Sequence, residues 1–315
     1  MKDKYERKIN YMRLSVTDLC NYRCQYCMPS EGIKKCAHDD ILSLEDFEEI
    51  VRAGATLGID KVRITGGEPL VRCGLTDLIE NIHGIPEIRD IAMTTNGSLL
   101  AGKAEMLKKA GLKRLNISLD TLRPDRFQKI TRRGNLYDVL GGIKEAQKAG
   151  FDNIKINTVL MGGVNDDEIR DFAAFAMENA FTVRFIELMP MGECANWDRK
   201  RFLKAEKVLE VLPELRRVTH DGVSEVFALP GGRGRIGLIR PLGNRFCQSC
   251  NRIRITSDGM LKPCLHSDME IPLKGLKGEA LRDVLIKGIG LKPEHHAMIE
   301  NGVSDAARNM NRIGG

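Results

Sequence analysis

Short apolar runs alternate with helical patterns over the first two thirds of the chain. In the helical segment LSLEDFEEIVRAGATLG, Ser43 and Asp46 have the spacing of a capping box. A regular β-then-α alternation predicts a parallel sheet with right-handed crossovers, although periodicity does not decide whether that sheet closes into a barrel. The predicted buried strands are YMRLSV, KVRIT, IAMTT, RLNISL, IKINTVL and VRFIEL, which start near residues 11, 61, 91, 114, 154 and 183.

Polar and glycine-rich loops follow the predicted strands. Parallel α/β folds bind ligands at the carboxyl ends of their strands, so we expect a site among these loops. They are TGGEP at 65–69, TTNG at 94–97, SLD at 118–120 and ELMPMGE at 187–193.

The alternation stops beyond about residue 215. The stretches SEVFALPGGRGRIGLIRPLG and NRIRITSDGMLKPCL have the pattern of hairpins, and a helical segment and a glycine-terminated tail follow them. We therefore expect a large body at residues 1–215 and a smaller α+β module at residues 216–315.

Composition fits a globular protein with a sizeable core, since 42% of the residues are hydrophobic and 29% are charged. No run is long and apolar enough for a membrane span, and the first residues lack the apolar stretch of a secretion signal. These features predict a cytoplasmic protein that does not bind membranes.

The formal net charge of +6 comes from one segment, because residues 226–257 contain arginines but no lysine, aspartate or glutamate. The planar fork of arginine suits phosphates and base edges, which favours an anionic nucleotide as ligand over a long nucleic acid. A solvated basic hairpin is the alternative. The arginines are Arg233, Arg235, Arg240, Arg245, Arg252 and Arg254.

Six of the nine cysteines form two groups, and in a reducing compartment clustered thiols more often bind metal than form disulfides. The first trio, Cys20, Cys24 and Cys27, follows the first predicted strand. Structural zinc prefers four ligands, whereas three thiolates on a four-iron cluster leave one iron open for another ligand. An iron–sulfur cluster is therefore the favoured interpretation, with incomplete zinc and coincidence as alternatives.

The second trio is Cys247, Cys250 and Cys264, which lies within or next to the arginine-rich segment. Spacing alone leaves a zinc site open here, with His266 as a fourth ligand. The neighbouring pair His295 and His296 is expected at the surface.

The motif C-x3-C-x2-C with Tyr26 before its last cysteine, together with GGEP at 66–69, resembles the radical S-adenosylmethionine superfamily. Within it, the chain is similar to the MoaA family, the GTP 3',8-cyclases of molybdenum cofactor biosynthesis. The similar segments span nearly the whole chain: LSVTDLCNYRCQYCMP, RITGGEPLVR, TTNG, ISLDTL, KINTVLMGGVND, RFIELMPMG, FCQSCNRIRITSDGMLKPCL and the terminal GG.

The resemblance implies a partial, open (β/α)6 TIM-type barrel with a C-terminal α+β module that carries a second iron–sulfur cluster. Each trio would hold one [4Fe-4S] cluster, and the two clusters would face each other across the barrel mouth. Supporting catalytic roles would fall to Gly314 and Gly315, with Arg252 and Arg254. Contacts to S-adenosylmethionine would come from Tyr26, Gly67, Ser118 and Met189. Contacts to GTP would come from Arg13, Arg63, Thr94, Lys155, Arg184, Arg252 and Arg254.

The resemblance also implies the chemistry. Cleavage of S-adenosylmethionine would give methionine and a 5'-deoxyadenosyl radical, which removes hydrogen from carbon 3' of GTP so that this carbon attacks carbon 8 of guanine. The product would be 3',8-cyclo-7,8-dihydro-GTP, used by a cyclic pyranopterin monophosphate synthase of the MoaC type. An electron donor is implied, a homodimer is left open, and no nucleic acid partner is expected.

Two rival interpretations are a peptide-modifying radical enzyme and a zinc-stabilised nucleic-acid-binding protein. The chain also departs from the family pattern, because Gly162 stands where MRGVND would place an arginine. Phosphate affinity on that side is therefore left open.

Overall fold

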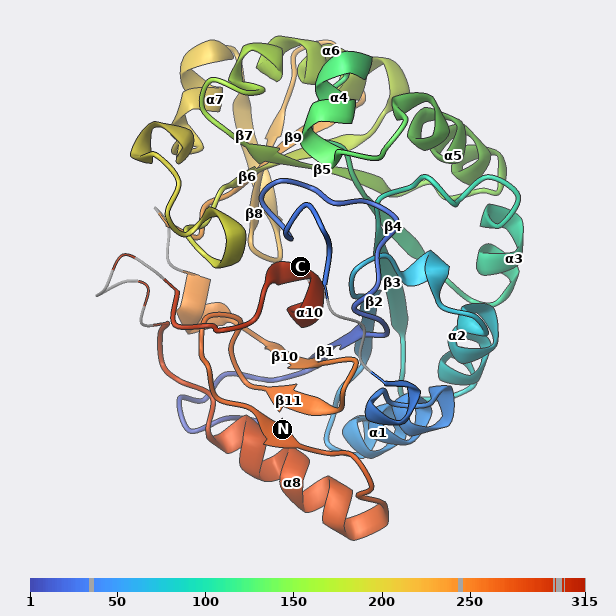
Figure 1. The fold of residues 1–315 in the computed structure, drawn as a ribbon. Coiled ribbons are helices and arrows are strands. Elements are labelled where there is room, and N and C mark those ends of the chain that lie inside the picture. The colour runs from blue at the N-terminus through green and yellow to red at the C-terminus, as the bar shows by residue number, and fades with distance from the viewer. Residues whose placement is uncertain (34–36, 243–245, 297, 299–301, 303, 315) are drawn as a thin grey trace.

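The computed structural model describes residues 1–33, 37–242, 246–296, 298, 302 and 304–314. Its strands form a curved sheet of order β12-β11-β10-β1-β2-β3-β4-β5-β6-β9-β8-β7. Figure 1 shows helices around the outside of this sheet and the C-terminal end near its centre. The strands are β1 (Tyr11–Ser15), β2 (Lys61–Thr65), β3 (Asp90–Thr95), β4 (Arg114–Ser118), β5 (Ile154–Leu160), β6 (Thr182–Glu187), β7 (Arg216–Asp221), β8 (Ser224–Ala228), β9 (Arg235–Ile239), β10 (Arg252–Ile255), β11 (Met260–Lys262) and β12 (Ile271–Pro272).

The helices follow the strands in the order that the sequence predicts. The α-helices are α1 (Leu44–Thr56), α2 (Leu75–His83), α3 (Ala104–Lys109), α4 (Pro124–Thr131), α5 (Leu136–Lys148), α6 (Ile169–Asn179), α7 (Glu206–Val211), α8 (Gly278–Gly290) and α10 (Met310–Ile313). Short 3-10 helices are η1 (His38–Asp40), η2 (Pro69–Val71), η3 (Asp166–Glu168), η4 (Gly192–Cys194), η5 (Arg199–Arg201) and η6 (Phe246–Ser249). None of the helices in the described part of the chain has the length and apolar character to span a bilayer.

The six predicted strands are confirmed, because β1 to β6 begin within one residue of the expected positions and pair in parallel. The predicted capping box is also present: Asp46 N donates to Ser43 Oγ at 3.1 Å, and Ser43 N donates to Asp46 Oδ2 at 2.9 Å. Such a cap stabilises a helix start by about 1 kcal/mol. Behind it, Phe47, Ile50 and Val51 of α1 are buried in the core.

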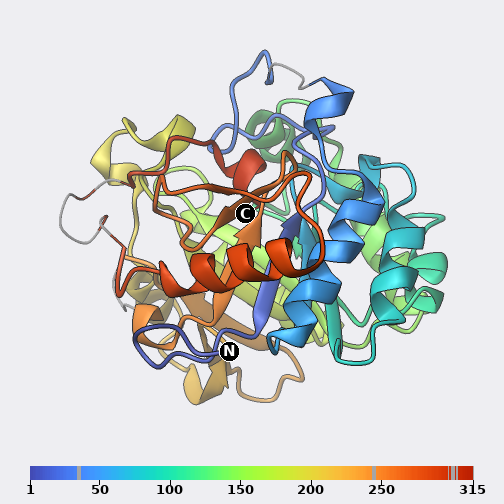
Figure 2. The same ribbon diagram turned by 90° about the horizontal axis from the view of Figure 1, so that it is seen from below.

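The chain beyond residue 215 extends both edges of the sheet. Strand β10 pairs in parallel with β1, and β9 pairs in parallel with β6. The two predicted hairpins form there as the antiparallel pairs β8–β9 and β10–β11. Helix α8 packs beside α1, as Figure 2 shows from below. The expected partial barrel with a C-terminal module is confirmed, and the sequence did not predict that the module adds three strands to each edge of the barrel sheet.

Candidate functional site

Alternation along the parallel strands places a set of cations on the inner face of the barrel. On β1, Met12 and Leu14 are fully buried in the core that the helices cover, so Tyr11 and Arg13 lie on the opposite face. The other strands alternate in the same way. All seven side chains matched to GTP binding thus share the inner face: Arg13, Arg63, Thr94, Lys155, Arg184, Arg252 and Arg254.

The arginines are close neighbours across the sheet. Arg13 has Arg254 as its register partner on one side and Arg63 on the other. The Tyr11 ring lies 5.7 Å from the guanidinium of Arg63 and 5.7 Å from that of Arg252. Like charges directly opposite each other destabilise a sheet. A row of cations that the fold itself disfavours therefore indicates an anionic ligand.

Burial and the neighbouring cations both disfavour the charged forms of these side chains. Burial lowers the pKa of Arg13 well below its usual value, and Arg254 and Arg63 lower it further. Burial and then Arg63 lower the pKa of Arg184 to about 9, and burial and then Arg252 lower that of Arg254 to about 10. A bound polyphosphate would relieve this repulsion by supplying the opposite charge.

Two further side chains hold the cations in place. Lys155 forms an ion pair with Asp221, and Arg184 donates through Nε and Nη2 to Asn157 Oδ1 at 2.9 and 2.6 Å. Burial lowers the pKa of Lys155, while Asp221 acts in the opposite direction. Sequence reasoning missed Asp221 and Asn157, because neither belongs to a recognisable motif.

The first trio lies in a tight turn after β1. The backbone N–H groups of Cys27 and Met28 donate to the carbonyl of Cys24 at 3.0 and 3.2 Å, and Tyr22 N donates to the Cys20 sulfur at 3.3 Å. Burial raises the pKa of Cys20 to about 11 and that of Cys27 to about 12. Burial and then the thiol of Cys27 raise the pKa of Cys24. Thiolates here need a strong positive charge beside them, which the irons of a cluster supply, so these residues fit that group.

The second trio flanks two strands, with two members before β10 and one after β11. Lys292 is only 2% exposed, and its Nζ donates to the carbonyls of Arg252 and Pro263 at 2.8 Å each. The lysine therefore braces both segments that carry the trio. Burial raises the pKa of Cys250, but Lys292 and Arg252 outweigh it and hold the pKa below its usual value. At Cys250 the neighbouring cations thus favour a thiolate, whereas burial raises the pKa of Cys247. Three thiols around a buried cation fit an iron–sulfur cluster.

The histidines near the second trio make contacts of their own. His266 Nδ1 lies 3.1 Å from Ser304 Oγ, and its ring lies 4.5 Å from that of His296. The expectation that His296 lies at the surface is wrong, since it is 8% exposed, whereas His295 is exposed. Within the described chain, no three His, Cys, Asp or Glu side chains converge closely enough for one metal ion. A four-iron cluster does not require such convergence, because each thiolate binds a different iron.

The two trios lie at opposite ends of the parallel strands. Strand β10 is parallel to β1, with Tyr11 opposite Arg252. The first trio follows the carboxyl end of β1, and two members of the second precede the amino end of β10. The trios are thus separated along the strands, and the expectation that their clusters face each other stays a prediction. The cationic inner face lies between them, over a strand length of about 16 Å.

The GGEP loop packs directly on the loop of the first trio. Gly67 N donates to the carbonyl of Thr17 and Glu68 N to that of Leu19, both at 2.8 Å. A Cβ atom would lie 2.3 Å from Thr17 O if placed on Gly66, whose φ is 141°, and 2.2 Å from Leu19 O if placed on Gly67. Both glycines are therefore needed for this close approach. It places Gly67 beside the first trio, where the resemblance expects S-adenosylmethionine.

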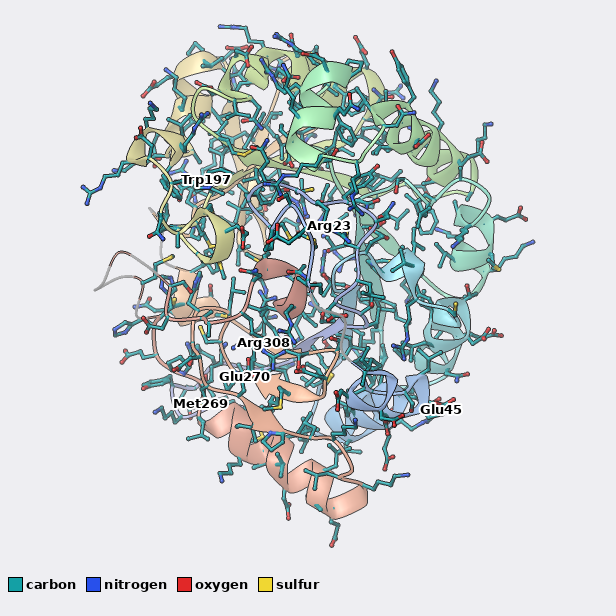
Figure 3. The ribbon with its side chains drawn as sticks, in the orientation of Figure 1. Arg23, Glu45, Trp197, Met269, Glu270 and Arg308 are labelled. Carbon is teal, nitrogen blue, oxygen red and sulfur yellow. The ribbon has the colours of Figure 1, made fainter. Side chains whose placement is uncertain are left out.

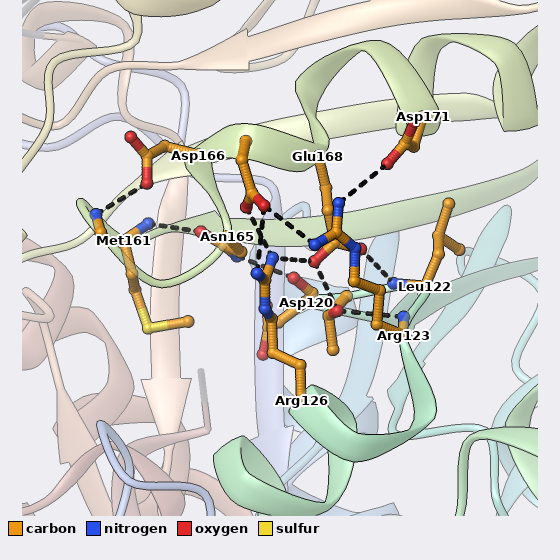
Figure 4. Close-up of polar contacts among 12 residues, drawn as sticks. Asp120, Leu122, Arg123, Arg126, Met161, Asn165, Asp166, Glu168 and Asp171 are labelled. Atoms are coloured by element: carbon orange, nitrogen blue, oxygen red, sulfur yellow. Dashed lines mark hydrogen bonds and ion pairs between the residues drawn. The ribbon is translucent and has the colours of Figure 1, made fainter.

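Tyr26 of the first trio's loop is held by a buried polar network, part of which Figure 4 shows. Its hydroxyl donates to Asp120 Oδ2 at 2.7 Å, and Val159 N donates to Asp120 Oδ1 at 2.8 Å. Asn165 Nδ2 donates to the Asp120 carbonyl at 2.7 Å. Burial raises the pKa of Asp120 to about 6. Ser118, at the end of β4, is half-buried just before this network.

The C-terminal segment enters the barrel near the first trio. Gly314 adopts φ of 77°, and a Cβ atom on it would lie 2.5 Å from Thr65 Cγ2. Arg254 Nη1 donates to the Gly314 carbonyl at 2.5 Å. Met189 packs against the small cluster that contains Ile313. The structure thus places the C-terminal end near the barrel centre with Met189 packed against the tail, while Gly315 lies outside the described residues.

Gly162 packs too tightly to carry a side chain. Its N–H donates to the Arg201 carbonyl at 3.0 Å, and a Cβ atom would lie 2.0 Å from Lys200 O. The missing arginine of the family pattern therefore corresponds to a close backbone contact in this chain.

Comparison with known proteins agrees with this geometry. Residues 14–176 match the sequence model of the radical SAM superfamily, and residues 181–298 match the one described as Molybdenum Cofactor Synthesis C. The chain is 54% identical to the GTP 3',8-cyclase of Alkaliphilus metalliredigens and 51% identical to that of Alkaliphilus oremlandii, over 320 residues and 100% of both chains in each case.

Among solved structures, the chain resembles Streptococcus suis SuiB bound to S-adenosylmethionine, with a TM-score of 0.65 over 91% of this chain and 67% of that one. At 16% identity this likeness supports the fold alone. The sequence matches cover the full length of this chain and of both relatives. The chain therefore belongs to the GTP 3',8-cyclase family of the radical S-adenosylmethionine superfamily.

Proposed function

We propose that this chain converts GTP to 3',8-cyclo-7,8-dihydro-GTP, with release of 5'-deoxyadenosine and methionine, in the first step of molybdenum cofactor biosynthesis. The observation that carries the proposal is the buried row of cations between two cysteine trios. Identity of 54% to a GTP 3',8-cyclase over the whole chain supports the same substrate.

The cofactors are S-adenosylmethionine and two [4Fe-4S] clusters. In our proposal the first trio binds one cluster, and Tyr26, Gly67, Ser118 and Met189 contact S-adenosylmethionine. When bound, this cluster would supply the electron for reductive cleavage of S-adenosylmethionine. The protein holds this site rigid, because Tyr26 is fixed by Asp120 and the GGEP loop is fixed by the backbone after β1.

GTP lies along the inner face in this proposal, with the second trio's cluster at the base. The side chains of Arg13, Arg63, Lys155 and Arg184 neutralise the phosphates, Thr94 orients Arg63, and Arg252 and Arg254 hold the nucleoside near the second trio. Fixing the ribose and the base in one geometry holds carbon 3' close to carbon 8, which lowers the entropic cost of forming the bond between them. We assign the barrel to residues 1–215 and the second cluster's module to residues 216–315.

The tail completes the site from the other side. Gly314 has its carbonyl on Arg254 and approaches Thr65 closely. We propose that Gly314, and Gly315 after it, support catalysis together with Arg252 and Arg254. Residues without side chains fit a pocket that is already crowded.

The reaction requires partners. Reductive cleavage consumes one electron, and the radical left after carbon 3' bonds to carbon 8 takes up a second electron and a proton, so an electron donor is required. A MoaC-type synthase would take up the product. A cytoplasmic location would keep the free thiols reduced and the clusters intact. Sedimentation of the anaerobic protein would distinguish a monomer from a homodimer.

The proposal is tested by anaerobic incubation with GTP, S-adenosylmethionine and dithionite, followed by chromatography of nucleoside products. We expect 5'-deoxyadenosine and the cyclised nucleotide in equal amounts, from a protein with about eight irons per chain. Cys264→Ser should retain cleavage of S-adenosylmethionine and lose cyclisation, whereas Cys73→Ser, at an exposed cysteine outside both trios, should match the wild type. Formation of 5'-deoxyadenosine without a GTP-derived product would exclude GTP as the substrate.

A peptide substrate is the rival within the superfamily, since a solved structure with the same fold is described as SuiB bound to the precursor peptide SuiA. The buried arginine row favours a polyphosphate instead, because a peptide backbone carries no comparable charge.

A further inference from the structure

The C-terminal segment is inserted into the barrel, where Asn311 and Ile313 are buried. Helix α10 has four residues, which is too short to be stable in isolation. Asn311 Nδ2 donates to the Asp18 carbonyl at 3.0 Å, and the Asn311 N–H donates to the Cys27 sulfur. Gly314 meets Arg254 at the end of the segment. How deeply the segment sits against the first trio and the inner-face arginine also depends on an anchor in the chain just before it.

Arg308, just before this segment, provides that anchor. Its Nε and Nη2 donate to the two carboxylate oxygens of Glu270 at 2.6 Å each, and its Nη1 contacts Asp258 at 2.8 Å. Figure 3 labels Arg308 and Glu270 side by side near the C-terminal helix. All three side chains are mostly buried, with 16 to 23% of each exposed. Bidentate, charge-assisted contacts of this kind are strong and fix orientation.

Both acids are themselves held by the hairpin that carries the inner-face arginines. Asp258 accepts from Thr256 Oγ1 at 2.5 Å in the turn between β10 and β11. Glu270 accepts from Nζ of the fully buried Lys262, on β11, at 3.0 Å. Strand β10 carries Arg252 and Arg254, so the ion pairs connect the tail to the element that holds the nucleotide-facing arginines.

We propose that Arg308, Asp258 and Glu270 form a latch that seats residues 309–314 in the barrel, and that Arg308 is a positioning residue for cyclisation. The latch determines how far residues 309–314 extend into the barrel, and it thereby positions the Gly314 carbonyl to accept a hydrogen bond from Arg254. Arg308 acts only through the tail, and its effect on turnover rests on the proposed function.

The test compares Arg308→Gln, Arg308→Lys and Asp258→Asn in the full-length, cluster-loaded protein. Hydrogen exchange of residues 309–314 reports the tail directly, and the ratio of cyclised nucleotide to 5'-deoxyadenosine reports coupling. We expect Arg308→Gln to speed tail exchange about tenfold and to lower the ratio severalfold, because the anchoring contacts are lost. Iron content and the rate of 5'-deoxyadenosine formation should stay at the wild-type level. Arg308→Lys, which keeps the charge without the fork, and Asp258→Asn should lie in between.

The matched control is Arg282→Gln, which makes the same change at an exposed position of α8 and should alter neither quantity. Unchanged tail exchange in Arg308→Gln would overturn the latch. Faster exchange with an unchanged product ratio would overturn its positioning role. If the wild type formed no cyclised GTP at all, the proposed function would fail, and the exchange experiment would still decide the latch.

Discussion

Replacing Glu68 by glutamine tests how the GGEP loop is held beside the first trio. Glu68 is fully buried, and both of its oxygens are acceptors. Oε1 accepts from Leu70 N at 3.0 Å and from Thr95 Oγ1 at 2.7 Å, and Oε2 accepts from Asn96 N at 2.7 Å. One carboxylate thus connects the GGEP loop to the TTNG loop. Glutamine has the same shape but only one acceptor atom on its amide.

The geometry sets the size of the effect. With the amide oxygen at the Oε1 position, the NH2 group faces the N–H of Asn96, and in the flipped orientation it faces the N–H of Leu70. Either way, a buried backbone donor loses its acceptor and meets a second donor. Losing one hydrogen bond to a charged acceptor and leaving a buried N–H unsatisfied costs about 3 to 5 kcal/mol together. We expect that reduction in the free energy of unfolding of Glu68→Gln, with weaker binding of S-adenosylmethionine.

The measurement is urea unfolding under anaerobic conditions at pH 8, with Glu45→Gln as control. Glu45 is exposed in the first turn of α1, so the same change there should cost less than 1 kcal/mol. Burial raises the pKa of Glu68, so the difference from the wild type should shrink in acid, where the carboxyl group carries its own proton. An unfolding free energy of Glu68→Gln within 1 kcal/mol of the wild type at pH 8 would refute the assignment of Glu68 as a threefold acceptor.

Three further predictions concern the tail, the second trio and the Tyr26 network. Gly314→Ala should reduce cyclisation by about tenfold or more, because a left-handed φ costs a Cβ residue roughly 1 to 2 kcal/mol and Thr65 blocks the new atom. The control is Gly102→Ala, because Gly102 also has a left-handed φ but has open space around it. Equal yields of cyclised product from the two variants would refute the prediction. Lys292→Met should lower the iron content toward about four per chain, because the two segments around the second trio lose their brace, while Lys287→Met on the exposed face of α8 should not. Burial raises the pKa of Asp120 to about 6, so ionisation of Asp120 lowers the wild-type free energy of unfolding as the pH rises through that value. Asp120→Asn lacks this ionisation, so between pH 5 and pH 7.5 its free energy of unfolding should rise by about 1 kcal/mol relative to the wild type. Unfolding curves with equal pH dependence for both proteins would contradict the last prediction.

Local patterns were enough to identify many parts of this protein. The period of the apolar runs located the strands of the barrel, since a buried parallel strand must be apolar and short. The spacing of Ser43 and Asp46 predicted the cap of α1 correctly. The spacing of the first trio favoured an open iron–sulfur cluster over zinc, and the concentration of arginines in residues 226–257 pointed to an anionic nucleotide. Each of these features depends on residues close together in the chain.

Which residues meet in space was decided by the tertiary structure. Arg13 and Arg254 are 241 positions apart in the sequence, and they become neighbours only because β10 pairs with β1. Family resemblance had named both residues, but neither periodicity nor charge predicts that pairing. The parallel direction of β10, which the sequence did not predict, places the two trios at opposite ends of the strands.

Lys292 and Arg308 carried no signal in the sequence, because a lone cation in a polar stretch is ordinarily solvated. Their burial follows from distant carbonyls and carboxylates that the folded chain brings to them. The sequence by itself thus determined the order of strands and helices, and it predicted the two cysteine trios as cluster ligands and an anionic substrate. The pairing of the sheet edges, the separation of the two trios and the seating of the tail were decided by long-range burial and electrostatics, which local spacing does not encode.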